Sequence, residues 1–234
     1  MGCGSSGIRI GGFVKQSLID WEGVLAAVVF TKGCNLRCGY CHNPSLVIPA
    51  LLERTPDIPE AEVLDYLARR RGWLEGVVVT GGEPTLQAGL PAFLRRVRAL
   101  GYPIRLDTNG THPEVVERLL AEGVVDGVAM DIKHLPEYEA YRRVTPPSET
   151  MMARIRRTID LLRRSGVAYH FRTTVLPDLH TPEVRARLAE LFAGDPYVEH
   201  VFRQEGLDGL VGDWIAAEDP FRTCDVPAPE RETK

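Results

Sequence analysis

The feature of this 234-residue chain that most restricts its fold is a regular alternation of short apolar runs with longer helix-patterned segments. The apolar runs are rich in β-branched residues and have the length of buried strands, at residues 25–30, 77–79, 104–107, 127–131, 169–174 and 200–202. The helix-patterned segments lie between them, at residues 60–71, 91–100, 113–122, 148–165 and 182–192. Each is followed by a glycine suited to a left-handed helix C-terminus, at Gly72, Gly101, Gly123, Gly166 and Gly194.

Strands separated by helices predict a parallel sheet with right-handed crossovers. Six strands are too few for a closed eight-stranded barrel, which takes about 250 residues. The expected fold is therefore α/β, an open partial (β/α)6 barrel with parallel strands. A doubly wound open sheet is the alternative, because periodicity alone does not separate the two. The expected organisation is a lead-in segment over residues 1–23, the barrel over residues 24–218 and an irregular tail over residues 219–234.

Composition excludes several classes of partner. The net charge is −4 and the pI is about 5.9, which argues against a general binder of nucleic acid or of membrane surfaces. No apolar run approaches the roughly 20 residues of a membrane span. The five cysteines are odd in number and three of them are bunched, which argues against a disulfide framework and for a reducing cytoplasm.

Cys34, Cys38 and Cys41 place three thiols within eight residues. A closed zinc site, or a [4Fe–4S] cluster that only transfers electrons, usually takes four protein ligands. Three ligands on a four-iron cluster leave one iron open to a small molecule. The alternative is a zinc site completed by His42, but His42 is adjacent to Cys41 and the two would struggle to reach one tetrahedral ion. The remaining cysteines lie near the termini, at Cys3 and Cys224.

Polar residues recur where the predicted strands end, which is where parallel α/β folds gather functional side chains. The second run ends in Gly81-Gly82-Glu83, whose two glycines leave the backbone bare for the close approach of a ligand. Glu83 either complements a bound cation or caps the next helix. The following runs bring further polar residues to the same rim, at Asp107, Thr108, Asp131, Lys133 and Arg172.

The spacing C-x3-C-x2-C, with aromatic Tyr40 before the last cysteine, resembles the radical S-adenosylmethionine (SAM) superfamily. Four further motifs resemble its glycyl-radical-enzyme activases: Cys-His-Asn-Pro at residues 41–44, Gly-Gly-Glu at 81–83, Asp-Thr-Asn-Gly at 107–110 and Asp-Ile-Lys at 131–133. The resemblance covers roughly residues 11–204 and is densest over residues 17–43, where the chain is most similar to activating proteins of anaerobic ribonucleoside-triphosphate reductase. Pyruvate formate-lyase activases carry a glycine- and proline-containing segment in place of residues 19–23, and this departure favours the reductase as partner.

The resemblance implies that Cys34, Cys38 and Cys41 hold a [4Fe–4S] cluster whose fourth iron binds the amino and carboxylate groups of SAM, and that Lys133 acts with them in catalysis. It assigns SAM contacts to Tyr40, His42, Asn43, Gly81, Gly82, Glu83, Asp107, Thr108, Asp131, Lys133 and Arg172. In the activases the acidic residues also hold a monovalent cation against the SAM carboxylate. Further candidates for the adenosyl end are His200 and Gln204.

The resemblance further implies the function. It indicates reductive cleavage of SAM and formation of a glycyl radical on a partner enzyme whose glycine loop closes the open barrel. Anaerobic ribonucleotide reductase is the expected partner, with a flavodoxin or ferredoxin as electron donor. The alternatives are an activase of another glycyl radical enzyme of the pyruvate formate-lyase type, a small-molecule radical SAM enzyme similar to 7-carboxy-7-deazaguanine synthase, and a non-catalytic zinc or cluster module.

Overall fold

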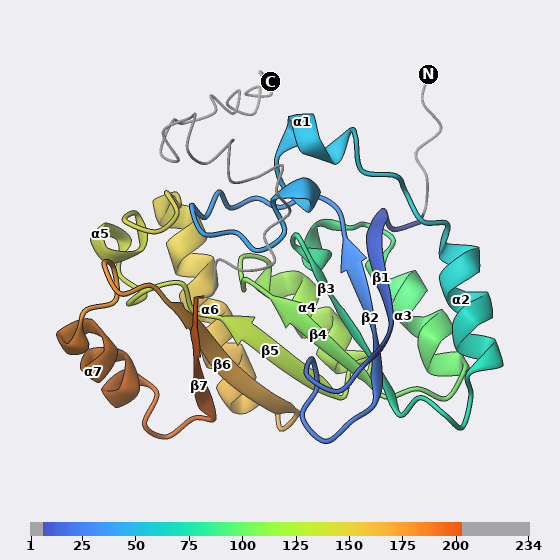
Figure 1. Ribbon diagram of the computed structural model, residues 1–234. Helices are drawn as coiled ribbons and strands as arrows, with labels where there is room; N and C mark the ends of the chain where they lie inside the picture. The colour runs from blue at the N-terminus through green and yellow to red at the C-terminus, as the bar shows by residue number, and fades with distance from the viewer. Residues whose placement is uncertain (1–6, 203–234) are drawn as a thin grey trace, which may run out of the picture.

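The computed structural model describes residues 7–202, which form one seven-stranded sheet with its strands in chain order (Figure 1). The strands are β1 (Ile10–Ser17), β2 (Ala26–Thr31), β3 (Gly76–Gly81), β4 (Ile104–Thr108), β5 (Gly127–Asp131), β6 (Ala168–Val175) and β7 (Tyr197–Val201). Strands β2 to β7 are parallel, as predicted. The strand order does not reverse between β1 and β7, so the doubly wound alternative is wrong and the open partial barrel is confirmed.

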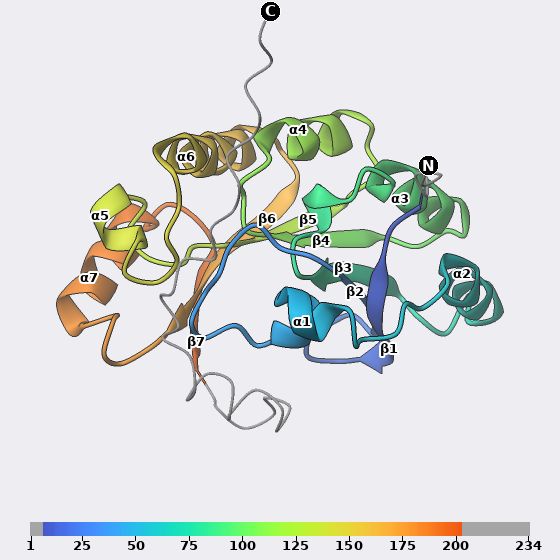
Figure 2. The same cartoon turned by 90° about the horizontal axis from the view of Figure 1, so that it is seen from above.

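Five helices cover the outer, convex face of this curved sheet (Figure 2). They are α2 (Glu60–Arg69), α3 (Leu90–Ala99), α4 (Pro113–Ala121), α6 (Glu149–Arg164) and α7 (Pro182–Leu191), and all five were predicted. Shorter elements were not predicted, because a single turn is too short to show a period: α1 (Pro49–Leu52), α5 (Tyr138–Tyr141) and the 3₁₀ turns η1 (Pro44–Leu46) and η2 (Pro84–Leu86). In the described residues, no helix is long and apolar enough to cross a membrane.

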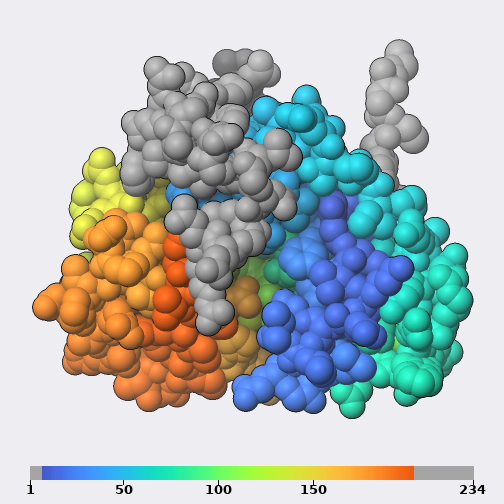
Figure 3. Space-filling model, in the orientation of Figure 1, coloured from blue at the N-terminus to red at the C-terminus, as the bar shows by residue number. Residues whose placement is uncertain are grey.

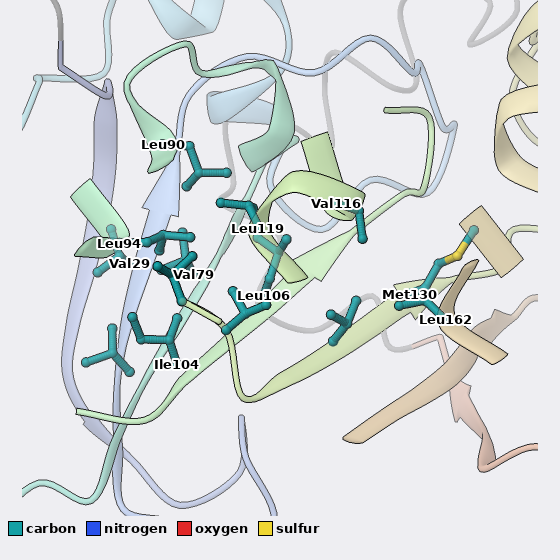
Figure 4. Close-up of a cluster of buried hydrophobic side chains, with 14 of the residues drawn as sticks. Val29, Val79, Leu90, Leu94, Ile104, Leu106, Val116, Leu119, Met130 and Leu162 are labelled. Carbon is teal, nitrogen blue, oxygen red and sulfur yellow. The ribbon is translucent and has the colours of Figure 1, made fainter. Parts of the chain in front are cut away.

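The main core lies between the sheet and its helices (Figure 4). Successive side chains of a strand point to opposite faces, so alternate residues of each strand enter this core. On β4, Ile104 and Leu106 are fully buried against the helical layer, which includes Leu94 of α3 and Leu119 of α4. The intervening residues of the parallel strands therefore face the concave side of the sheet.

The concave side is divided into an apolar and a charged half. A small second core on β2 and β3 contains Ala26, Val28 and Val78. Trp21 packs on it from the segment before β2, where a Cβ at Gly76 would lie 3.0 Å from the indole ring. Beyond Trp21, the concave side carries charged side chains from β4 to β6, among them Arg105, Asp107, Asp131 and Arg172, and they form the site described below.

Three local expectations differ from the structure. Strand β1 was not predicted and lies within the expected lead-in segment, because Gly11-Gly12 weakens the strand pattern. The side chain of Leu46 packs closely on β1 at Gly11, where an added Cβ would lie 2.4 Å from Leu46 Cδ2. Strand β7 begins at Tyr197, before the predicted residue 200. Of the five predicted left-handed glycines, Gly194 alone lacks a positive φ. The predicted tail over residues 219–234 lies outside the described residues, and the division into segments stays a prediction.

Candidate functional site

A cavity of about 1290 Å³ occupies the concave side of the sheet. Every residue predicted to hold the cluster or SAM, Gln204 excepted, lines this cavity: Cys34, Cys38, Cys41, Tyr40, His42, Asn43, Gly81, Gly82, Glu83, Asp107, Thr108, Asp131, Lys133, Arg172 and His200. Gln204 lies outside the described residues, as do Cys3 and Cys224. The cavity opens sideways between β7 and the segment joining β1 to β2, and Figure 3 shows these two parts of the chain, in orange-red and blue, on either side of the opening.

The three predicted cysteines lie on the loop over residues 33–43, here called the cysteine loop, directly after β2. The backbone N–H of Cys41 donates to the carbonyl of Cys38 at 3.1 Å, which turns the loop back on itself. The thiols are close enough to influence one another electrostatically, Cys34 with Cys38, Cys38 with Cys41 and Cys41 with Cys34. The loop therefore directs all three sulfurs toward one region of the cavity.

Burial raises the pKa of Cys34 to about 12, and the nearby Glu83 carboxylate adds to the shift. Burial also raises the pKa of Cys38 and of Cys41. Three soft sulfur ligands shielded from water suit an iron–sulfur cluster, whose irons hold cysteines as thiolates. No three His, Cys, Asp or Glu side chains among residues 7–202 are arranged to hold a single metal ion. A four-iron cluster needs a different arrangement, with one thiol on each of three irons, and this donor set fits it.

A chain of alternating charges crosses the ends of β4, β5 and β6. Arg105 Nε donates to Asp107 Oδ1 at 2.9 Å, and Arg172 Nη1 donates to Asp107 Oδ2 at 2.9 Å. Arg172 also donates through Nε to Asp131, and Lys133 Nζ donates to Asp131 Oδ2 at 2.8 Å. The structure therefore brings together four predicted residues and adds Arg105, which the sequence analysis did not single out.

The charge chain keeps Asp131 and Lys133 ionised. Burial opposes the charge of Asp131, but Arg172 and Lys133 outweigh it and lower the pKa of that carboxyl group. Burial likewise opposes the charge of Lys133, but Asp131 outweighs it and the pKa of the ammonium is raised. The three cations of the charge chain (Arg105, Lys133 and Arg172) outnumber its two anions (Asp107 and Asp131) by one. Lys133 is also close enough to the three thiols to lower the pKa of each. The part of the cavity between the thiols and the charge chain therefore suits a ligand that carries a carboxylate beside the cluster.

The Gly81-Gly82-Glu83 segment packs directly against the backbone at the end of β2 and the start of the cysteine loop. Gly82 N–H donates to the carbonyl of Thr31 at 2.9 Å, and Glu83 N–H donates to the carbonyl of Gly33 at 2.8 Å. A Cβ on Gly82 would lie 2.0 Å from the Gly33 oxygen. The bare backbone thus admits the start of the cysteine loop, which sequence reasoning did not foresee, while a SAM contact of Gly81 and Gly82 stays a prediction.

Glu83 is fully buried and its carboxylate joins two strand ends. It caps η2 by accepting from Thr85 N–H at 3.1 Å and from the Thr85 hydroxyl. It also accepts from the Thr108 hydroxyl and from Asn109 N–H, both at 2.7 Å. The capping alternative is confirmed. Contacts of Glu83 and Thr108 with a ligand stay predictions.

Tyr40 and His42, the residues predicted to lie near the adenine of SAM, both pack against the ring of Phe202. Tyr40 is buried, and its ring lies edge-on to Phe202 with a centroid separation of 6.2 Å. His42 lies against the same ring at 5.3 Å. The Tyr40 hydroxyl is buried and has no hydrogen-bond partner among residues 7–202. Asn43 donates its backbone N–H to the Cys41 thiol.

Sequence reasoning missed the residues that hold the cysteine loop from outside. Asn35 Nδ2 donates to Thr111 Oγ1 at 2.8 Å, and Asn109 Nδ2 donates to Asn35 Oδ1 at 3.0 Å. Thr145 Oγ1 accepts from Arg37 N–H at 3.1 Å and is hydrogen-bonded to Cys38. Asn109 lies inside the Asp-Thr-Asn-Gly motif, which was a usable signal. Thr145 carries none, because its loop is more than 100 residues from the cysteines.

The chain matches the radical SAM superfamily over residues 28–192. It is 34% identical over 179 residues to a glycyl-radical enzyme activating enzyme of Methanocaldococcus jannaschii, covering 74% of this chain and 71% of that protein. It is 29% identical over 202 residues to the pyruvate formate-lyase-activating enzyme of Clostridium pasteurianum, covering 82% and 79%. Among solved structures, Streptococcus suis SuiB bound to S-adenosylmethionine shares the fold, with a TM-score of 0.54, 15% identity and coverage of 81% and 49%.

The family match spans the cysteine loop, the charge chain and most of the sheet, and the first two proteins compared above are named as activating enzymes, of a glycyl radical enzyme and of pyruvate formate-lyase. This chain belongs to the radical SAM superfamily, within its glycyl-radical-enzyme activases, whose cofactors are a [4Fe–4S] cluster and SAM.

Proposed function

We propose that this activase generates the glycyl radical of an anaerobic ribonucleoside-triphosphate reductase. The observation that carries the activase function is one cavity lined by both the three thiols and the charge chain, open on one side. The choice of partner is supported by residues 17–43, which resemble the reductase activating proteins, and by residues 19–23, which depart from the pyruvate formate-lyase activases.

The cluster and SAM, when bound, supply the one-electron chemistry that removes a hydrogen atom from the target glycine. Cys34, Cys38 and Cys41 would hold three of the irons as thiolates. Lys133 and Arg172 would bind the SAM carboxylate. Asp107 and Asp131 keep these two cations charged and oriented, and they are the side chains to which we assign a monovalent cation.

Tyr40 and His42 would contact the adenine, since their rings already lie together at the mouth. Asn43 would keep the last thiolate of the cluster hydrogen-bonded through its backbone N–H. Lys133 would be the catalytic side chain, because its ammonium faces both the thiols and the charge chain. These assignments place the adenosyl end of SAM toward β7, beside His200.

The partner's glycine loop would enter through the side opening. The rim of this opening carries exposed apolar side chains on both sides: Leu18 (72% exposed) and Ile19 (93%) from the segment before β2, and Val198 (44%) and Val201 (73%) from β7. A bound loop that covered these residues would exclude water from the cavity, which a reactive intermediate needs. A flavodoxin or ferredoxin in a reducing cytoplasm would supply the electron.

An activase of pyruvate formate-lyase is the second candidate, because the Clostridium pasteurianum relative matches 82% of this chain. The test is electron paramagnetic resonance on the anaerobically reconstituted protein, mixed with SAM, a reductant and either candidate partner. We expect a glycyl doublet with the reductase and none with the lyase. A doublet with the lyase alone would overturn the choice of partner, and SAM cleavage without a doublet in either mixture would contradict both partner assignments.

Cys38→Ala is the matched variant for this experiment. We expect it to lose the cluster and SAM cleavage, because one of three iron ligands is missing, while its circular dichroism spectrum stays that of the folded sheet. Iron content and 5′-deoxyadenosine formation measure the loss. If this variant still cleaved SAM, the assignment of the cluster ligands would be wrong.

A further inference from the structure

The side-chain amide of Asn109 lies between the end of β4 and the cysteine loop, and its orientation is determined by its neighbours. Asn109 Oδ1 accepts from Thr111 N–H at 3.0 Å and from the Thr111 hydroxyl at 2.7 Å. A backbone N–H only donates, so the atom facing it must be the amide oxygen. The NH₂ group therefore faces the cysteine loop.

The NH₂ group has two acceptors there. Asn109 Nδ2 lies 3.0 Å from Asn35 Oδ1 and 3.9 Å from Cys34 Sγ, the second distance being that of a weak N–H···S hydrogen bond. Cys34 Sγ also accepts from Leu36 N–H at 3.4 Å. One hydrogen of the amide thus holds the loop, and the other points at a sulfur that ligates iron in the holoenzyme.

Asn109 has little freedom to turn away. It is 5% exposed, and its backbone N–H donates to the buried carboxylate of Glu83 at 2.7 Å. Asn35 is in turn held by Thr111 through the 2.8 Å bond from its Nδ2. Rotation of the Asn109 amide would break several buried hydrogen bonds at once, and each such loss is costly.

We propose that Asn109 tunes the cluster by donating a hydrogen bond to the thiolate of Cys34. Hydrogen bonds to the sulfurs of an iron–sulfur cluster set its reduction potential, because they stabilise the more negatively charged, reduced state. Asn109 is therefore a positioning residue that makes the cluster easier to reduce. The proposal rests on the [4Fe–4S] cluster of the activase and is independent of the partner's identity.

The test is the midpoint potential of the reconstituted cluster, measured without partner enzyme by a redox titration followed by electron paramagnetic resonance. Asn109→Leu keeps the branched shape and the number of side-chain heavy atoms but removes the donor. We expect its midpoint to shift to a lower potential, so that the ratio of reduced to oxidised cluster at the wild-type midpoint falls about threefold to tenfold, the range for one hydrogen bond. Asn109→Asp, which cannot donate and adds a negative charge, should shift it further.

Thr111→Val is the matched control. It removes the bonds of the Thr111 hydroxyl to Asn109, Asn35 and His112 but keeps the Thr111 backbone N–H that orients the amide, so its midpoint should equal that of the wild type. An unchanged midpoint in Asn109→Leu with full iron content would overturn the proposal. Loss of iron from both Asn109 variants, with Thr111→Val fully loaded, would also overturn it, because Asn109 would then serve only to assemble the loop. Failure to form a glycyl radical leaves this measurement unaffected.

Discussion

At the scale of single residues, the buried carboxylate of Glu83 has an unusual number of partners. Four hydrogen bonds reach its two oxygens, from two threonine hydroxyls and two backbone N–H groups. These donors belong to η2 and to the end of β4, and the Glu83 backbone pairs with the cysteine loop. One residue thus orients three segments around the site, two of them through its side chain and the cysteine loop through its backbone.

Glu83→Gln should reduce the free energy of unfolding by about 1–3 kcal/mol, the cost of leaving a buried polar group without a partner. The hydroxyls of Thr85 and Thr108 can rotate to accept from the new NH₂ group, but a backbone N–H of Thr85 or Asn109 cannot. Urea denaturation followed by circular dichroism measures the change. The control is Glu190→Gln, an exposed site on α7 that should stay within about 0.5 kcal/mol of the wild type. Equal effects at the two positions would contradict this account of Glu83.

At the scale of elements, the end of β3 and the start of the cysteine loop touch through their backbones. The contact is possible only without a side chain, since a Cβ on Gly82 would overlap the carbonyl of Gly33. The sequence motif therefore records a packing requirement in addition to any contact with SAM. The neighbouring Gly81 has φ of +118°, a left-handed value that favours glycine.

Gly82→Ala should push the cysteine loop away from β3 and lower both stability and iron content. Inserting an atom into a packed contact costs about 1–3 kcal/mol. Iron analysis after anaerobic reconstitution and thermal unfolding measure the two effects. Gly194→Ala is the matched control, because Gly194 has no atom within 4 Å of an added Cβ and its φ is not positive. A Gly82→Ala protein with full iron and unchanged stability would show that the loop moves freely there.

At the scale of the whole molecule, two buried histidines connect the loop after β5 with the loop after β6. His134 follows β5 and His180 follows β6, with ring centroids 5.1 Å apart. Each Nδ1 accepts a backbone N–H, at 2.8 Å and 3.1 Å respectively, so each Nε2 carries the hydrogen. His180 Nε2 lies 3.0 Å from the carbonyl of Lys133, and the pair thereby supports the backbone at Lys133.

The protein should lose stability as the pH falls below about 6.5, the ordinary pKa of histidine. Burial lowers the pKa of His134 and of His180. His180 and Arg143 lower the pKa of His134 further, and Arg143 lowers that of His180. Hydrogen bonds to backbone groups, together with Glu137 for His134 and Glu199 for His180, oppose these shifts but do not outweigh burial. The unfolded chain therefore binds protons that the native chain does not, so the free energy of unfolding decreases as the pH falls through this window.

Urea midpoints at about pH 7 and pH 5 measure this dependence. His180→Gln removes one of the two titrating groups, so its midpoint should fall less between the two pH values than that of the wild type. The comparison is between slopes, because carboxylates titrate in both proteins. An identical slope in the variant would contradict the assignment of the pH dependence to this pair.

Local patterns in the sequence were sufficient for the order of β2 to β6 and of the five long helices, and for their bounds to within about two residues, because apolar periodicity and proline and glycine at helix ends act within a few residues. They failed for β1, where Gly11-Gly12 hides the strand, and for the start of β7. The three cysteines and the polar strand ends were also visible in the sequence, and all of them lie in the cavity.

The sequence by itself determined the alternation of parallel strands with helices and the loop with three thiols, since both depend on residues that are close together in the chain. The tertiary structure alone decided that Arg172 bridges Asp107 and Asp131, and that the Asn109 amide reaches Cys34. Such contacts join residues 41 to 75 positions apart, and they depend on sheet register and curvature, which no local pattern encodes.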